Sequence, residues 1–112
     1  MAAHARFASL LLALTLPACA HKSYYKETNK LQPAAVAADK VTVFSGASEV
    51  RRNYVELGRY RGKAPSVKEA VDAAKAACGK AGGTMLIHSK LPYKAGERGY
   101  KVEAVCAVLA QG

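Results

Sequence analysis

A short apolar segment near the N-terminus most limits what this chain of 112 residues can fold into. Residues 7–16 contain only Ser9 and Thr15 as polar interruptions, and Arg6 precedes them. The run is too short to span a bilayer, which takes about 20 apolar residues, but its length and preceding positive charge are typical of a signal peptide. We therefore expect residues 1–18 to be removed, so that the remainder folds as an exported protein.

The end of this segment resembles the lipobox of bacterial lipoproteins. In Leu16-Pro17-Ala18-Cys19 a cysteine stands where a signal peptidase cuts and where the thiol carries a diacylglycerol, although Pro17 replaces a small or β-branched residue. The resemblance implies that Cys19 is the first residue of the mature chain and carries a covalent lipid of the palmitate type. The alternative is a secretory signal cut after Ala18 or Ala20, without lipid.

The mature chain is small and basic. The whole sequence has a formal net charge of +9, and loss of residues 1–18 removes one arginine and no acidic residue. On an exported domain, this charge points to anionic lipid head groups, lipopolysaccharide phosphates or acidic envelope proteins as partners. The export signal argues against nucleic acid, and the alternative is that scattered lysines keep the domain soluble.

The sequence divides into a tether at residues 19–39 and one small domain at residues 40–112. No apolar period is sustained across the first segment, and a flexible chain of that length reaches on the order of 25 Å. Lys22, Lys26 and Lys30 recur at intervals of four. They either contact anionic head groups or are solvated linker charges.

The domain pattern predicts an α+β fold, with one helix packed on a sheet of about four strands in β-β-α-β-β order. Runs rich in β-branched and aromatic residues predict strands at 41–44, 54–61, 84–89 and 100–110. Gly58 interrupts the apolar alternation of the second strand, which predicts a glycine bulge. Ser66-Val67-Lys68-Glu69 has the form of a capping box, so we expect a helix from there to about Ala81.

Two cysteines remain beside the one assigned to the lipid. Cys78 lies on the apolar stripe of the predicted helix, and Cys106 lies on one face of the last strand. In an exported protein, such a pair is more typical of a disulfide than of two free thiols. A bond between them would stabilise the fold by roughly 3–4 kcal/mol in the chain-entropy model.

Cations before and along the second strand form the candidate binding site. They are Arg51, Arg52, Arg59, Arg61 and Lys63. We expect them to gather at one edge, where they would bind an anionic envelope component or an acidic partner.

No catalytic pattern stands out in the sequence, so we expect a protein that is not an enzyme and that has no cofactor apart from the lipid. A thiol enzyme needs a nucleophilic cysteine beside a base or in Cys-x-x-Cys spacing, and neither occurs. His88 lies beside Leu86 in an apolar strand, which is typical of a core or edge histidine. Cys78, Cys106 and His88 lack an evident fourth ligand for zinc or copper, so we expect no metal, and a metal-binding or redox domain is a secondary hypothesis.

The order of these segments resembles one family, the outer-membrane sensor lipoproteins of the Rcs envelope-stress phosphorelay. The resemblance covers nearly all of residues 40–110. It is carried by Val41-Thr42-Val43-Phe44, Glu49-Val50, Tyr54-Val55-Glu56-Leu57-Gly58, a proline-serine helix start, Leu86-Ile87-His88-Ser89 and Ala104-Val105-Cys106. It implies an outer-membrane lipoprotein whose periplasmic domain senses envelope stress or lipopolysaccharide and signals by protein contact. A structural envelope lipoprotein without a signalling role is the alternative.

The chain departs from the family pattern in its cysteines and in its tether. Cys106 matches a family cysteine whose usual partner would follow Ser89 directly, where this chain has Lys90. A further family pair is missing and Cys78 is present instead, so the disulfide connectivity must differ. The family tether is also longer and rich in proline, whereas this one contains only Pro33.

Overall fold

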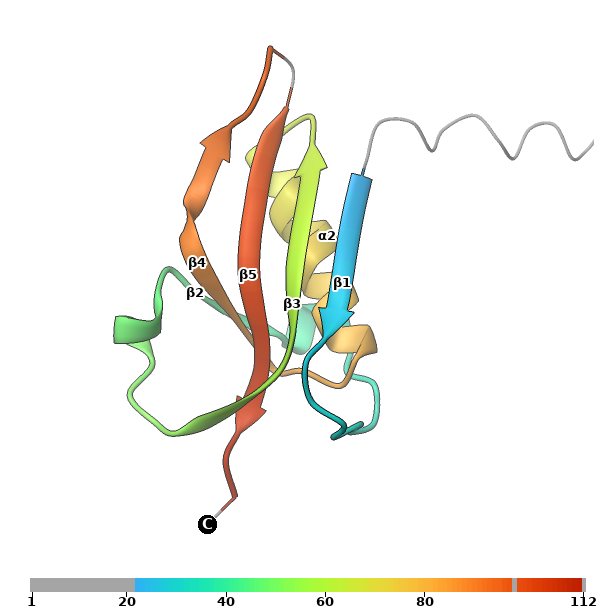
Figure 1. Ribbon diagram of the computed structural model, residues 1–112, viewed down its shortest axis with the longest axis vertical. Coiled ribbons are helices and arrows are strands. Elements are labelled where there is room, and N and C mark those ends of the chain that lie inside the picture. The colour runs from blue at the N-terminus through green and yellow to red at the C-terminus, as the bar shows by residue number, and fades with distance from the viewer. Residues whose placement is uncertain (1–21, 98, 112) are drawn as a thin grey trace, which may run out of the picture.

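A computed structural model describes residues 22–97 and 99–111, which form a mixed β-sheet with one α-helix packed on one face (Figure 1). The signal peptide and Cys19 lie outside these residues. The strands are β1 (Lys22–Glu27), β2 (Thr42–Phe44), β3 (Tyr54–Ala64), β4 (Met85–Lys94) and β5 (Tyr100–Leu109), and the helix is α2 (Val67–Lys80). The sheet order is β1-β3-β5-β4-β2, with β2 and β4 parallel and the other neighbours antiparallel.

The α+β class and the single helix on a sheet are confirmed, but the expected number of about four strands is one too few, because β1 precedes the predicted β-β-α-β-β order. The sheet has five strands, because β1 forms within the segment expected to be a flexible tether. β1 pairs with β3, and its Tyr25 ring occupies the space beside Gly58, where any Cβ would overlap it. The glycine predicted to form a bulge does so, since the β3–β5 register shifts between Glu56 and Gly58.

The segment after β1 also packs on the domain. The backbone N–H of Val36 donates a 2.8 Å hydrogen bond to the carbonyl of Gly79, and a Cβ on that glycine would meet the carbonyl oxygen of Val36. Gly82, with φ +92°, lies against the carbonyl of Pro33, and Val41 is buried in the core. Residues 22–41 are therefore part of the domain. The glycines at the end of α2 lack a Cβ, so the backbone of Pro33 and Val36 can pack closely against the end of the helix.

Strands β3 and β4 continue through residues 62–64 and 90–94, beyond the strand ends predicted at residues 61 and 89. β5 lies between them and supplies partners as far as Tyr100, which pairs with Ala64 on one side and Lys94 on the other. Register shifts in β4 accommodate Pro92, whose missing N–H disfavours a regular ladder. Long-range pairing therefore outweighs the local glycine and proline signals.

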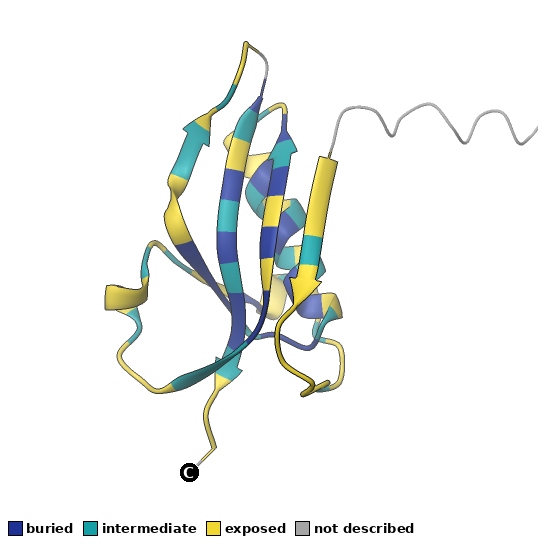
Figure 2. Ribbon diagram, viewed as in Figure 1, coloured by how far each residue is buried: buried dark blue, intermediate teal, exposed yellow. Residues whose placement is uncertain are grey.

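Helix α2 begins at the predicted cap, where the Glu69 N–H donates a 3.2 Å hydrogen bond to Ser66 Oγ. Its small buried residues face the sheet and bring it close to the large side chains of β3, β4 and β5. This core is formed by Ala70, Ala74, Cys78, Leu57, Tyr60, Leu86, Val102 and Cys106. Buried residues alternate with more exposed ones along β3 from Gly58 to Ala64 (Figure 2), so Arg59, Arg61 and Lys63 lie on the face of the sheet away from α2.

Candidate anion-binding face

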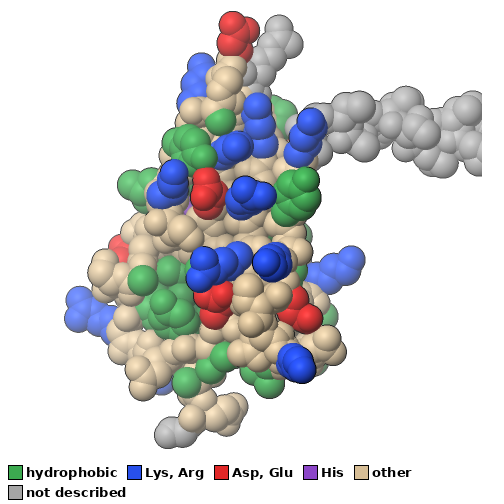
Figure 3. Space-filling model, in the orientation of Figure 1, with side chains coloured by type: hydrophobic (Ala, Val, Ile, Leu, Met, Phe, Trp, Pro, Cys, Tyr) green, Lys and Arg blue, Asp and Glu red, His purple; other side chains and the backbone are tan. Residues whose placement is uncertain are grey.

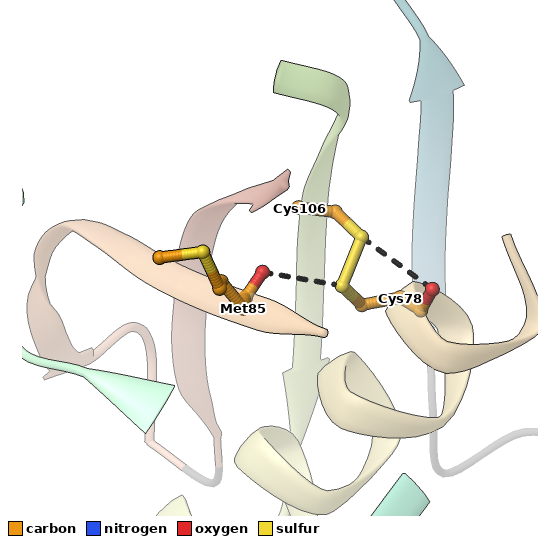
Figure 4. Close-up of a disulfide and its surroundings, with 3 residues drawn as sticks. All are labelled: Cys78, Met85 and Cys106. Atoms are coloured by element: carbon orange, nitrogen blue, oxygen red, sulfur yellow. Dashed lines mark hydrogen bonds between the residues drawn. A yellow bond between two sulfur atoms is a disulfide. The ribbon is translucent and has the colours of Figure 1, made fainter. Parts of the chain in front are cut away.

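The predicted disulfide between Cys78 and Cys106 is present and joins α2 to β5 (Figure 4). Both residues are fully buried, and each sulfur lies 3.4 Å from a backbone carbonyl oxygen, that of Met85 for Cys78 and that of Cys78 for Cys106. Gly83 lies against both sulfurs, with no room for a Cβ. The bond therefore lies in a tightly packed part of the core, where it links the helix to the sheet.

His88 is buried in β4, on the same side of the strand as Leu86. Burial lowers the pKa of its imidazole, so the neutral form is favoured. Its Nδ1 has no hydrogen-bond partner within the part of the chain that the structure describes.

Within residues 22–97 and 99–111, no three metal-ligating side chains lie together. No helix there is long and apolar enough to cross a membrane.

Three of the five predicted cations lie together on the face of the sheet opposite α2. Arg59 and Arg61 are exposed and Lys63 is half-buried, and they alternate along β3 with buried residues that face the helix. Directly opposite pairs on neighbouring strands share a face, so further cations join them from β1 and β5. The basic face consists of Lys22, Lys26, Arg59, Arg61, Lys63 and Lys101. Figure 3 looks onto this face and shows Lys and Arg side chains gathered over β1, β3 and β5.

Arg51 and Arg52 lie elsewhere, in the loop that precedes β3. They line a separate groove of about 430 Å³ together with Lys40, Phe44 and Val50. This loop folds over the second, smaller apolar cluster around Met85, Ile87 and Ala107, against which Val50 and Phe44 pack. That packing draws the two arginines away from the strand that follows them.

Local contacts hold the two arginines of the basic face in place. Arg59 forms two hydrogen bonds to Glu56, at 3.1 Å from Nε and 3.3 Å from Nη2, and they hold the pKa of that carboxyl below its usual range. Thr28 Oγ1 donates a further bond of 2.6 Å to Glu56. Arg61 lies over the ring of Tyr24, 5.5 Å from its centre, which favours a cation–π contact.

Glu103, which lies opposite Arg61 on β5, also has a hydrogen-bond partner. Glu103 accepts a 2.7 Å hydrogen bond from the hydroxyl of Tyr93, which raises the pKa of that hydroxyl. Lys90 lies over the same tyrosine ring, 4.8 Å from its centre. Both carboxylates of this face therefore have local partners, and the cations outnumber them.

Two hollows lie on the basic face, one on each side of the Arg61–Tyr24 contact. The smaller, of about 240 Å³, is lined by Lys22, Tyr24, Arg61, Gly62, Lys63, Lys101, Val102 and Glu103. The larger, of about 480 Å³, is lined by Tyr24, Tyr25, Lys26, Arg59, Tyr60, Arg61, Ser89, Glu103 and Ala104. Guanidinium groups and lysines around a shallow hollow suit phosphate or carboxylate groups, and the tyrosine rings add apolar contact.

The sequence prediction missed three members of the basic face: Lys22, Lys26 and Lys101. The first two lie on β1, where Lys22, Tyr24 and Lys26 alternate with Ser23, Tyr25 and Glu27, of which only Tyr25 is partly buried. The two adjacent tyrosines favour a strand, because aromatic residues are enriched in strands, but the segment shows no apolar alternation that would have placed the two lysines on one face. Lys101 could have been found from the alternation of the last strand, since it precedes the buried Val102.

Comparisons with known proteins show the fold and no family. No protein-family model and no curated protein sequence matches this chain. The fold is similar to the crystal structure of the Francisella virulence factor FvfA, with a TM-score of 0.56 and 12% sequence identity. The match covers 77% of this chain and 96% of that one. At this identity, the likeness concerns the arrangement of the helix and strands alone.

Proposed function

We propose that this protein is a lipid-anchored component of the bacterial outer membrane whose periplasmic domain recognises an anionic envelope component. Lipopolysaccharide phosphates are the ligand class that we favour, and an acidic envelope protein is the partner to which a signal would pass by contact, as in an Rcs-type phosphorelay. The observation that carries this proposal is the basic face, where six cations from three strands surround two hollows.

The chemistry of the basic face supports binding of a multiply charged anion. Each guanidinium presents a planar fork of donors that matches phosphate oxygens, and Arg59 is already oriented by its bonds to Glu56. Several cations on one surface also raise the local concentration of an anionic ligand and speed its association. In the disulfide, neither Cys78 nor Cys106 is a thiolate that could bind a metal.

Reversing two charges of the basic face is expected to abolish most ligand binding. In Arg59→Glu/Arg61→Glu, binding of the purified protein to immobilised lipopolysaccharide should fall at least about tenfold, because both guanidiniums beside the larger hollow are replaced by carboxylates. The matched control is Arg51→Glu/Arg52→Glu, which changes net charge equally in the separate groove. Lipopolysaccharide binding by this control variant should stay within about twofold of binding by the unmodified protein.

Circular dichroism and thermal unfolding of both variants establish that the fold is intact. An equal loss in both variants would show that net charge alone drives the association. Unchanged binding by the Arg59→Glu/Arg61→Glu variant would contradict the proposed function.

A further inference from the structure

Because residues 22–27 form strand β1, a lipid on Cys19 would hold the start of this strand close to the membrane. Lys22, the first residue of β1, follows Cys19 by three positions, and three residues span at most about 11 Å whatever their conformation. A flexible tether of residues 19–39 would instead have reached on the order of 25 Å. With the proposed lipid in place, the start of β1 must therefore lie close to the membrane surface.

A row of three lysines lies at this end of the sheet. Lys22 pairs directly with Lys63, which pairs directly with Lys101 on its other side, so three like charges are adjacent across β1, β3 and β5. Like charges placed directly opposite each other destabilise a sheet. Within residues 22–97 and 99–111, none of the three forms an ion pair with a carboxylate. An external anion would relieve this repulsion.

The lysine row borders the smaller hollow, and Figure 1 shows that β1 starts at the end of the sheet where β3 finishes. We propose that the row of Lys22, Lys63 and Lys101 docks on anionic head groups of the same membrane that holds the lipid anchor. This inference rests on the proposed lipid anchor and adds how the domain is oriented on the membrane. The lysine row faces the membrane, whereas Arg59 lies further along β3 and stays available to a partner.

A membrane surface suits this row better than a single small anion. Lysine is a flexible point charge that attracts mobile head groups without fixing their geometry, whereas a specific phosphate site favours the planar fork of arginine. A lipid anchor within about 11 Å also keeps the head groups at high effective concentration. Weak contacts from three lysines can therefore be occupied most of the time.

Lysine acylation on vesicles tests the docking with the lipidated protein purified from membranes. The protein is reconstituted in phosphatidylcholine alone, in phosphatidylcholine with phosphatidylglycerol, or in phosphatidylcholine with free inorganic phosphate. It is then treated with an amine-reactive ester, and mass spectrometry locates the labels. We expect Lys63 and Lys101 to react about threefold more slowly on the anionic vesicles, with recovery at high salt.

Lysines on α2 provide the internal control, because Lys75 and Lys80 lie on the opposite side of the sheet. Their labelling should stay within about twofold across all three conditions. In a second experiment, Lys63→Gln/Lys101→Gln should remove the protection of Lys22 on anionic vesicles, whereas Lys75→Gln/Lys80→Gln should retain it.

Two results would overturn the docking. Equal labelling of the row on both vesicle types would show that it does not contact head groups. Protection by free phosphate equal to that by the anionic vesicles would show a soluble anion site instead. In either case, retained dependence of lipopolysaccharide binding on Arg59 and Arg61 would leave the proposed function standing, so the two failures are distinguishable.

Discussion

Replacing Cys78 and Cys106 together by alanine is expected to lower the free energy of unfolding by about 3–4 kcal/mol. The bond joins residues 28 positions apart, so its loss frees a long loop in the unfolded chain. The helix contributes mainly alanine to the core, and a domain of this size has little stability to spare. Urea denaturation of the variant and the unmodified protein at one temperature measures the difference.

Reduction of the unmodified protein is the matched control for this double replacement. It breaks the same bond but keeps both sulfur atoms as thiols, and it should lower the free energy of unfolding by a similar amount. A loss of less than about 1 kcal/mol in both experiments would contradict the role assigned to the bond.

Gly58→Ala is expected to loosen β1 from the sheet and to destabilise the protein by about 1–3 kcal/mol. A Cβ at this position would overlap the Tyr25 ring and come within 2.7 Å of the backbone carbonyl oxygen of Lys26. The strand can relieve that overlap only by moving away from β3. Urea denaturation gives the stability change, and hydrogen exchange of the β1 amides reports the loosening directly.

Gly46→Ala is the matched control, because a Cβ at Gly46 meets no atom within 4 Å. Its stability should stay within about 0.5 kcal/mol of the unmodified protein. If Gly58→Ala left β1 amide exchange unchanged, the close packing of residues 22–27 on β3 would be wrong. The membrane docking inferred from the position of β1 would then lose its basis.

Local signals were sufficient for the helix and for most of the sheet. Ser66 and Glu69 mark the start of α2 because a cap depends on residues within one turn. Gly58 marks the bulge because it interrupts the apolar alternation in its own strand. The pairing of Cys78 with Cys106 was predictable from their even number in an exported chain and from their places on the helix and the last strand.

Strand β1 could not be recognised in the same way, because its stability comes from residues far along the chain. On the side opposite Lys22, Tyr24 and Lys26 only Tyr25 is apolar, since Ser23 and Glu27 are polar and exposed, so β1 lacks the apolar alternation that identifies a half-buried strand. Its pairing with β3 depends on the space beside Gly58. In sequence alone, a polar edge strand of this kind resembles a solvated linker.

The candidate site was also predicted only in part, because some of its residues are placed by local spacing and others by contacts with distant parts of the chain. Arg59, Arg61 and Lys63 share a face because they are two residues apart on one strand, which the sequence shows directly. Arg51 and Arg52 are close in sequence but lie in a loop whose direction is set by Val50 packing on the second apolar cluster. Lys22 and Lys26 joined the basic face only once β1 was known.

The intact mass of the protein purified from membranes, measured with and without reduction and alkylation, decides whether this chain carries both a lipid on Cys19 and the Cys78–Cys106 disulfide. We expect a mature chain that begins at Cys19, carries a diacylglycerol and an additional acyl chain, and takes up no alkylating reagent until it is reduced. After reduction, Cys78 and Cys106 should each take up one equivalent. A chain without lipid would contradict the membrane anchor, and two thiols reactive before reduction would contradict the disulfide.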